Sequence, residues 1–92
     1  MEYQIQVSKE AEKDLAIAKH HYTDFGLEYE FTEDYLTQIK YLKANPYLFQ
    51  IRYKIVRKVH FKIYKYSMHY VIKNDIVYIL RILNHSQEYD NS

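Results

Sequence analysis

The sequence of 92 residues contains no cysteine and no tryptophan, one glycine and one proline. Without cysteine the chain has no disulfide framework, no thiolate zinc site and no cysteine nucleophile. A single glycine excludes glycine-rich phosphate-binding loops. No apolar run approaches the roughly 18 residues of a membrane-spanning helix, and the N-terminus lacks the basic and apolar regions of a signal peptide. We therefore expect one cytoplasmic domain over residues 1–92 that does not enter a membrane.

Acidic residues are absent from residues 35–74, so the acidic and basic side chains lie mostly in different parts of the chain. Residues 1–34 carry nine acidic and three basic side chains, whereas residues 40–73 carry nine basic side chains and no acid, within a net charge of +1. The missing carboxylates disfavour glycosidase-like and two-metal chemistry in this basic half. The segregation predicts a positive surface that meets phosphate or an acidic protein.

The acidic half has the pattern of a strand followed by two helices. Residues Glu2 to Val7 alternate apolar and polar side chains, as in a half-buried strand. Ser8 is a good N-cap for a first helix, and Gly26, the only glycine, lies where a left-handed C-terminal cap is expected. The apolar stripe of this helix consists of Ala11, Leu15, Ala18, Tyr22 and Phe25. A second helix is predicted from Glu28 to Ala44, ending before Asn45-Pro46, and a short link makes the two helices an antiparallel hairpin.

The basic half is rich in β-branched and aromatic residues, which favour strands. Three strands are predicted, with a tight turn at residues 73–75: Ile55 to Tyr64, Tyr66 to Ile72 and Ile76 to Leu83. The expected order is β-α-α-β-β-β. The predicted fold class is α+β, a small antiparallel sheet with an N-terminal helical hairpin packed on it.

The five histidines do not have the spacing of metal ligands, so we predict no metal site and no cofactor. The cations of the basic half are more informative, because tyrosines are interleaved with them. On an extended strand Lys54, Lys58, His60 and Lys62 share one side, and such a stripe can contact phosphates. A solvated outer face of the sheet explains the same pattern equally well.

Two arginines break the alternation of their strands. Arg57 has the parity of the apolar residues around it, and Arg81 has the same relation to its own strand. A guanidinium in such a place is costly unless it is paired or opens into a cleft. Both a functional site and structural ion pairs, for example to the acidic helices, are compatible with this pattern.

The order of these features resembles a known family. The segments concerned are Ser8 to Leu15, the hairpin ending in Asn45-Pro46, Arg57, residues 66–70 (YSMHY) and residues 82–87 (ILNHSQ). Together they resemble the RelE/ParE superfamily of toxins from bacterial type II toxin–antitoxin systems, in the group of plasmid stabilisation proteins. The resemblance implies a cognate antitoxin as partner, and a growth-arresting toxin that acts on DNA gyrase if ParE-like, or on mRNA at the ribosome if RelE-like.

The resemblance also implies candidate site residues. In a RelE-like endoribonuclease, which needs no metal, the catalytic candidates are Arg57, Lys62, Arg81, His85 and Tyr89. Surfaces that bind the target or the antitoxin are expected at Lys54, Arg57, Lys58, Lys62, Lys65, Tyr66 and Tyr70. The middle-strand arginine of the ribonuclease members is replaced here by Ser67, and the preceding segment has no glutamate. We therefore favour a ParE-like toxin, with the endoribonuclease as the alternative and an inactive antitoxin-binding relative as a third possibility.

Overall fold

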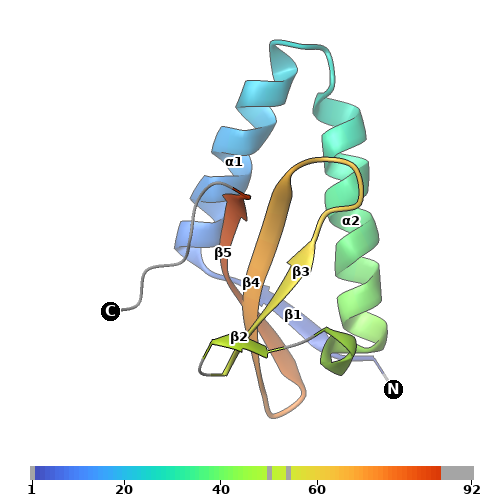
Figure 1. Cartoon of the computed structure of the whole chain (residues 1–92), viewed down its shortest axis with the longest axis vertical. Coiled ribbons are helices and arrows are strands. Elements are labelled where there is room, and N and C mark those ends of the chain that lie inside the picture. Colours follow the sequence, from blue (N-terminus) through green and yellow to red (C-terminus); the bar gives the residue numbers. More distant parts are fainter. Residues whose placement is uncertain (1, 50, 54, 86–92) are drawn as a thin grey trace.

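The computed structural model describes residues 2–49, 51–53 and 55–85, and Figure 1 shows their arrangement. In chain order the elements are β1 (Gln4–Val7), α1 (Lys9–Thr23), α2 (Glu28–Ala44), the 3₁₀ turn η1 (Pro46–Leu48), β2 (Ile51–Tyr53), β3 (Val56–His60), β4 (Tyr66–Lys73) and β5 (Ile76–Asn84). The strands form one sheet, and the two helices run along it side by side (Figure 1). The predicted α+β fold with a helical hairpin is thus confirmed.

The sheet differs from the prediction at its edge. Its strand order is β1-β5-β4-β3-β2, and β1 pairs with β5 in parallel, so the sheet is mixed and not wholly antiparallel. Strands joined by a tight hairpin must be antiparallel, but β1 and β5 are far apart in the chain and carry no such constraint. The backbone N–H of Ser8, just after β1, donates to the Ile79 carbonyl at 2.9 Å and ties the two strands together. The last strand, β5, lies inside the sheet between β1 and β4.

The boundaries of the helices follow local chemistry. The Ser8 hydroxyl accepts from the Ala11 backbone N–H at 3.0 Å and caps α1, as expected. Gly26 has a φ of 69°, in the left-handed region that glycine adopts without steric cost. Phe25 was expected in the apolar stripe of the first helix, but α1 ends at Thr23 and the Phe25 side chain is exposed. The second helix has the predicted bounds.

The basic half contains one strand more than predicted, and the first of its predicted strands is shorter, whereas the other two each extend one residue further. A short strand, β2, precedes them, and β3 ends at His60 instead of continuing to Tyr64. The continuation is prevented because Asp34 of α2 binds backbone N–H groups of residues 62–64 and holds them in a loop. The predicted turn after β4 is confirmed, since Asn74 and Asp75 have φ values of 51° and 65°.

The hydrophobic core lies between the sheet and the helical hairpin. Phe31 and Leu42 of α2 are fully buried against side chains of the sheet, among them Met68 and Ile82. The Phe31 ring stacks on the Tyr22 ring of α1, with centroids 4.9 Å apart. Each such side chain contributes about 1.5–3 kcal/mol by leaving water. Among the helices in the described part of the chain, none has both the length and the apolar character of a membrane-spanning helix.

Candidate functional site

Arg57 of β3 lies on the helix side of the sheet, where its parity placed it. Its Nη1 donates to the Phe49 carbonyl at 2.6 Å, and its guanidinium lies over the Tyr47 ring, 5.1 Å from the centroid. Next to it, the Tyr70 hydroxyl donates to the Pro46 carbonyl. Burial raises the pKa of Tyr70 to about 12, so its phenol stays protonated. Arg57 and Tyr70 therefore hold η1 against the sheet, and Tyr70 is not exposed to a partner.

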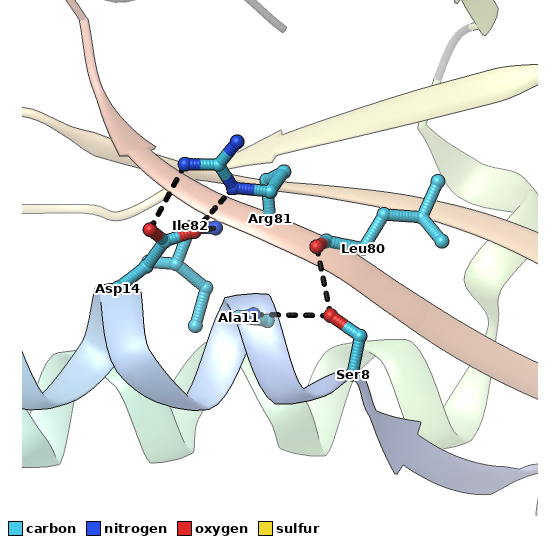
Figure 2. A network of polar contacts seen from close by, with 6 residues as sticks. All are labelled: Ser8, Ala11, Asp14, Leu80, Arg81 and Ile82. Atoms are coloured by element: carbon cyan, nitrogen blue, oxygen red, sulfur yellow. Dashed lines mark hydrogen bonds and ion pairs between the residues drawn. The ribbon is translucent and has the colours of Figure 1, made fainter.

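Arg81 of β5 is paired with the acidic helix α1. Its Nε and Nη2 donate to the two carboxylate oxygens of Asp14 at 2.7 and 3.1 Å, and the Ile82 backbone N–H donates to the same carboxylate at 2.9 Å (Figure 2). Nearby, the Ser8 hydroxyl donates to the Leu80 carbonyl at 2.8 Å. Beyond β1, the outer edge of β5 is thus satisfied by the side chains of Ser8, the N-cap of α1, and Asp14. Of the two explanations that the sequence allowed for Arg81, the structure shows the ion pair with an acidic helix.

The loop between β3 and β4 carries two of the predicted cations, Lys62 and Lys65, both exposed. The loop is held by Asp34, whose carboxylate accepts from three successive backbone N–H groups, at 3.0 Å for Lys62, 2.8 Å for Ile63 and 3.2 Å for Tyr64. Burial alone would raise the pKa of Asp34, but these hydrogen bonds outweigh it and lower the pKa below its ordinary value.

A cluster of histidines occupies the face of the sheet opposite to the helices. His60 Nδ1 lies 2.6 Å from the Ser67 hydroxyl and 3.2 Å from His85 Nε2, and the two imidazole rings are 4.8 Å apart. His85 Nε2 is also 3.2 Å from the Tyr66 carbonyl. Both histidines are exposed, whereas Ser67 is buried beneath them. We refer to His60, Ser67 and His85 as the histidine cluster.

Beside the histidine cluster lies a third imidazole. His69 of β4 pairs with Lys58 of β3 and with Arg81 of β5. Burial lowers its pKa to about 4, and the positive charges of Lys58 and Arg81 act in the same direction. His69 is therefore neutral at pH 7 and adds no third positive charge next to Lys58 and Arg81.

The structure brings together only part of the predicted set. His85 meets His60, which the sequence placed in the basic stripe but not among the catalytic candidates. The signal for this pair was weak, because the two residues lie 25 positions apart and become neighbours only through the strand pairing. Tyr66 is half-buried, and its ring packs against Phe31 with centroids 5.4 Å apart. Burial raises the pKa of Tyr66.

Arg57 and Arg81 do not converge on one point, because Arg57 turns to η1 and Arg81 turns to α1. Lys54 and Tyr89 lie outside the described residues. In residues 2–49, 51–53 and 55–85, no three histidine or acidic side chains are close enough together to hold a metal ion.

Residues 5–89 match the family profile of the ParE toxin of the type II toxin–antitoxin system parDE. The chain belongs to the ParE toxin family. No curated protein sequence matches this ParE-family chain.

Solved structures agree in fold with this member of the ParE family. A chain of the chromosomal ParDE system from P. aeruginosa is 22% identical in sequence, with a TM-score of 0.77. The alignment covers 89% of this chain and 95% of the P. aeruginosa chain. A chain of the E. coli DinJ–YafQ toxin–antitoxin complex has 15% identity and a TM-score of 0.68, with 98% and 100% covered. At these identities the similarity concerns the fold.

Proposed function

We propose that this chain arrests growth by inhibiting DNA gyrase and that a cognate antitoxin neutralises it. Membership of the ParE family supports this function, and a structural relative belongs to a ParDE system. The placement of the two arginines is the observation that favours gyrase inhibition over an endoribonuclease. Arg57 and Arg81 are both engaged by groups of the chain itself, Arg57 next to η1 and Arg81 at α1, so they do not form a common phosphate site with the other catalytic candidates.

The cations that remain available to a partner are on the surface of the basic half. Lys62 and Lys65 are exposed on the loop that Asp34 holds, and Lys58 is half-buried on the open face of the sheet. A fixed loop presents these charges with little loss of conformational freedom on binding. They suit an acidic protein surface, which is what we expect of both the antitoxin and the gyrase contact.

An assay of DNA supercoiling by purified gyrase tests the proposal. The wild-type chain should inhibit supercoiling, and the double variant Lys62→Glu/Lys65→Glu should require at least about ten times more protein for the same inhibition, because like charges then face each other. Lys13→Glu, an exposed charge reversal on α1, is the control and should inhibit like the wild type. Undiminished supercoiling in the presence of the wild-type chain would contradict the proposal.

The histidine cluster supports a second candidate, a ribosome-dependent endoribonuclease. Cleavage of RNA through its 2′-hydroxyl needs a base that accepts the hydroxyl proton and an acid that protonates the leaving oxygen. Two adjacent imidazoles, His60 and His85, can take these roles, since one is a base when neutral and the other is an acid when protonated. Lys62 and Arg81 would then have to supply the positive charge at the phosphate.

The nuclease is tested by mapping mRNA cleavage on purified ribosomes with the wild-type chain. If the nuclease assignment holds, His60→Ala, His85→Ala and Arg81→Ala should each reduce the cleavage rate at least about hundredfold, the usual contribution of a general acid or base. His20→Ala, an exposed histidine of α1, is the matched control. Intact mRNA in the wild-type reaction removes this candidate, and cleavage retained in all three variants removes these residues from the mechanism.

A further inference from the structure

The outer face of α2 carries apolar side chains that no other element covers. Tyr29, Glu33, Leu36 and Lys40 follow one another at intervals of four, three and four residues, and so form one stripe along the helix. The stripe lies opposite the buried side of α2, and Tyr29 is 71% and Leu36 49% exposed. In Figure 1, α2 lies at one side of the molecule with its outer side facing solvent. Tyr29 and Leu36 are thus two exposed apolar groups on one stripe of the helix, with the charged Glu33 between them.

The stripe carries one acidic and one basic side chain, Glu33 and Lys40. Glu33 and Lys40 lie equally far from a midpoint between Leu36 and Thr37, and both side chains are exposed. Within the described part of the chain the ion pair found is Asp14–Arg81, so Glu33 and Lys40 have no ion-pair partner there. Seven residues apart on one helix, they do not contact each other. The helix dipole accounts for charges in the first and last turn, but not for these two inner positions.

We propose that a second copy of the chain binds this stripe, with the two α2 helices antiparallel about a twofold axis that passes between Leu36 and Thr37. In such an isologous interface, residues equally distant from the axis lie opposite each other. Glu33 of each copy then faces Lys40 of the other, which makes two ion pairs. Leu36 meets its own counterpart next to the axis, and Tyr29 lies beside Ala44 of the second copy. The two charges of the stripe are thus complementary to those of a second copy.

The size of the interface sets its expected strength. With 17 residues, α2 is about 25 Å long. Contact along a single helix buries less than the roughly 800 Å² per partner of a standard stable interface. The dimer should therefore be weak, with a dissociation constant in the micromolar range. This inference does not depend on the gyrase proposal, because it concerns self-association alone.

Sedimentation analysis of the purified chain between about 1 μM and 1 mM tests the dimer directly. The wild type should pass from monomer to dimer within this range. Glu33→Lys places two lysines opposite each other across the interface, and Lys40→Glu places two glutamates opposite each other. Each variant should therefore dimerise at least about tenfold more weakly. The double variant Glu33→Lys/Lys40→Glu should associate like the wild type, because the pairs are restored with their charges exchanged.

A mixture of the two single variants is the sharpest form of this experiment. Each variant alone has like charges at the interface, but the mixed dimer has two opposite-charge pairs, so mixing should produce dimers that neither variant forms. Leu36→Glu should weaken the dimer, whereas Ile17→Glu, a change of an exposed apolar residue on α1, is the control and should not.

Three results would overturn the proposal: a wild-type chain that stays monomeric throughout, single variants that associate like the wild type, or mixing without effect. If the chain is monomeric and Leu36→Glu instead weakens its complex with the protein encoded by the neighbouring reading frame, the stripe belongs to that partner and not to a second copy.

Discussion

Asp14 of α1 and Arg81 of β5 are joined by two hydrogen bonds, of 2.7 and 3.1 Å, although 67 residues separate them in the chain. The same carboxylate accepts from the Ile82 backbone N–H (Figure 2). Asp14 therefore connects the acidic half of the chain to the basic half, at the point where β5 extends beyond β1. Arg81 was a catalytic candidate, and this contact gives it a structural function that is separate from any target.

We predict that Asp14→Ala lowers the free energy of unfolding by about 1–3 kcal/mol, because it leaves the Ile82 N–H and the guanidinium without their acceptor. Urea denaturation followed by circular dichroism measures this loss. Asp24→Ala, an exposed acid at the end of α1, should change stability by less than about 0.5 kcal/mol. In a double-mutant cycle with Arg81→Ala, purely additive effects would show that the pair does not act as a unit.

Asp34 predicts a loss of stability in acid. Its pKa in the folded chain is lower than the ordinary 3.8, so the stabilisation is present above that value and is lost as the pH falls through the folded pKa. At pH 7, Asp34→Ala should lower the free energy of unfolding by about 1–3 kcal/mol. The difference in the free energy of unfolding between the wild type and Asp34→Ala should become smaller below about pH 4. Chemical denaturation at pH 7 and at pH 3 measures this difference at both pH values. An equal difference at the two pH values would contradict this role of the carboxylate.

The protonation of His69 affects stability in a higher pH range than that of Asp34. Its folded pKa is about 4 against an ordinary 6.5, so between these values the unfolded chain binds more protons than the folded one. Stability should therefore decrease as the pH falls from 6.5 to 4, by at most about 1.4 kcal/mol per pH unit from this group. His69→Gln should flatten that part of the stability profile, which is measured by urea denaturation at a series of pH values. A variant that keeps the full wild-type slope would assign the effect to other groups.

Local features of the fold could be predicted from the sequence, because their chemistry lies within a few residues. Ser8 caps its helix, Gly26 takes the left-handed conformation and Asn74 begins a tight turn, and each was expected from residue type and position alone. The end of β3 at His60 was not predictable in this way. It depends on a carboxylate in α2 that reaches the loop only after the helix has packed on the sheet.

The candidate site was less predictable than the fold. The parity of Arg57 correctly indicated a side chain on the apolar face, but a sequence pattern does not identify the Phe49 carbonyl as its partner. The contact between His60 and His85 requires β4 to lie between β3 and the end of β5, which is a property of the sheet order and not of any segment. For the same reason the parallel pairing of β1 was missed.

The central claim is that this ParE-family chain acts on DNA gyrase and not on translation. Its most direct test is pulse-labelling of DNA and protein synthesis in cells within minutes of inducing the chain without a partner. We predict that thymidine incorporation falls first while amino-acid incorporation continues. An early loss of protein synthesis with DNA synthesis spared would contradict the claim and favour the endoribonuclease, and normal incorporation of both labels would contradict toxin activity altogether.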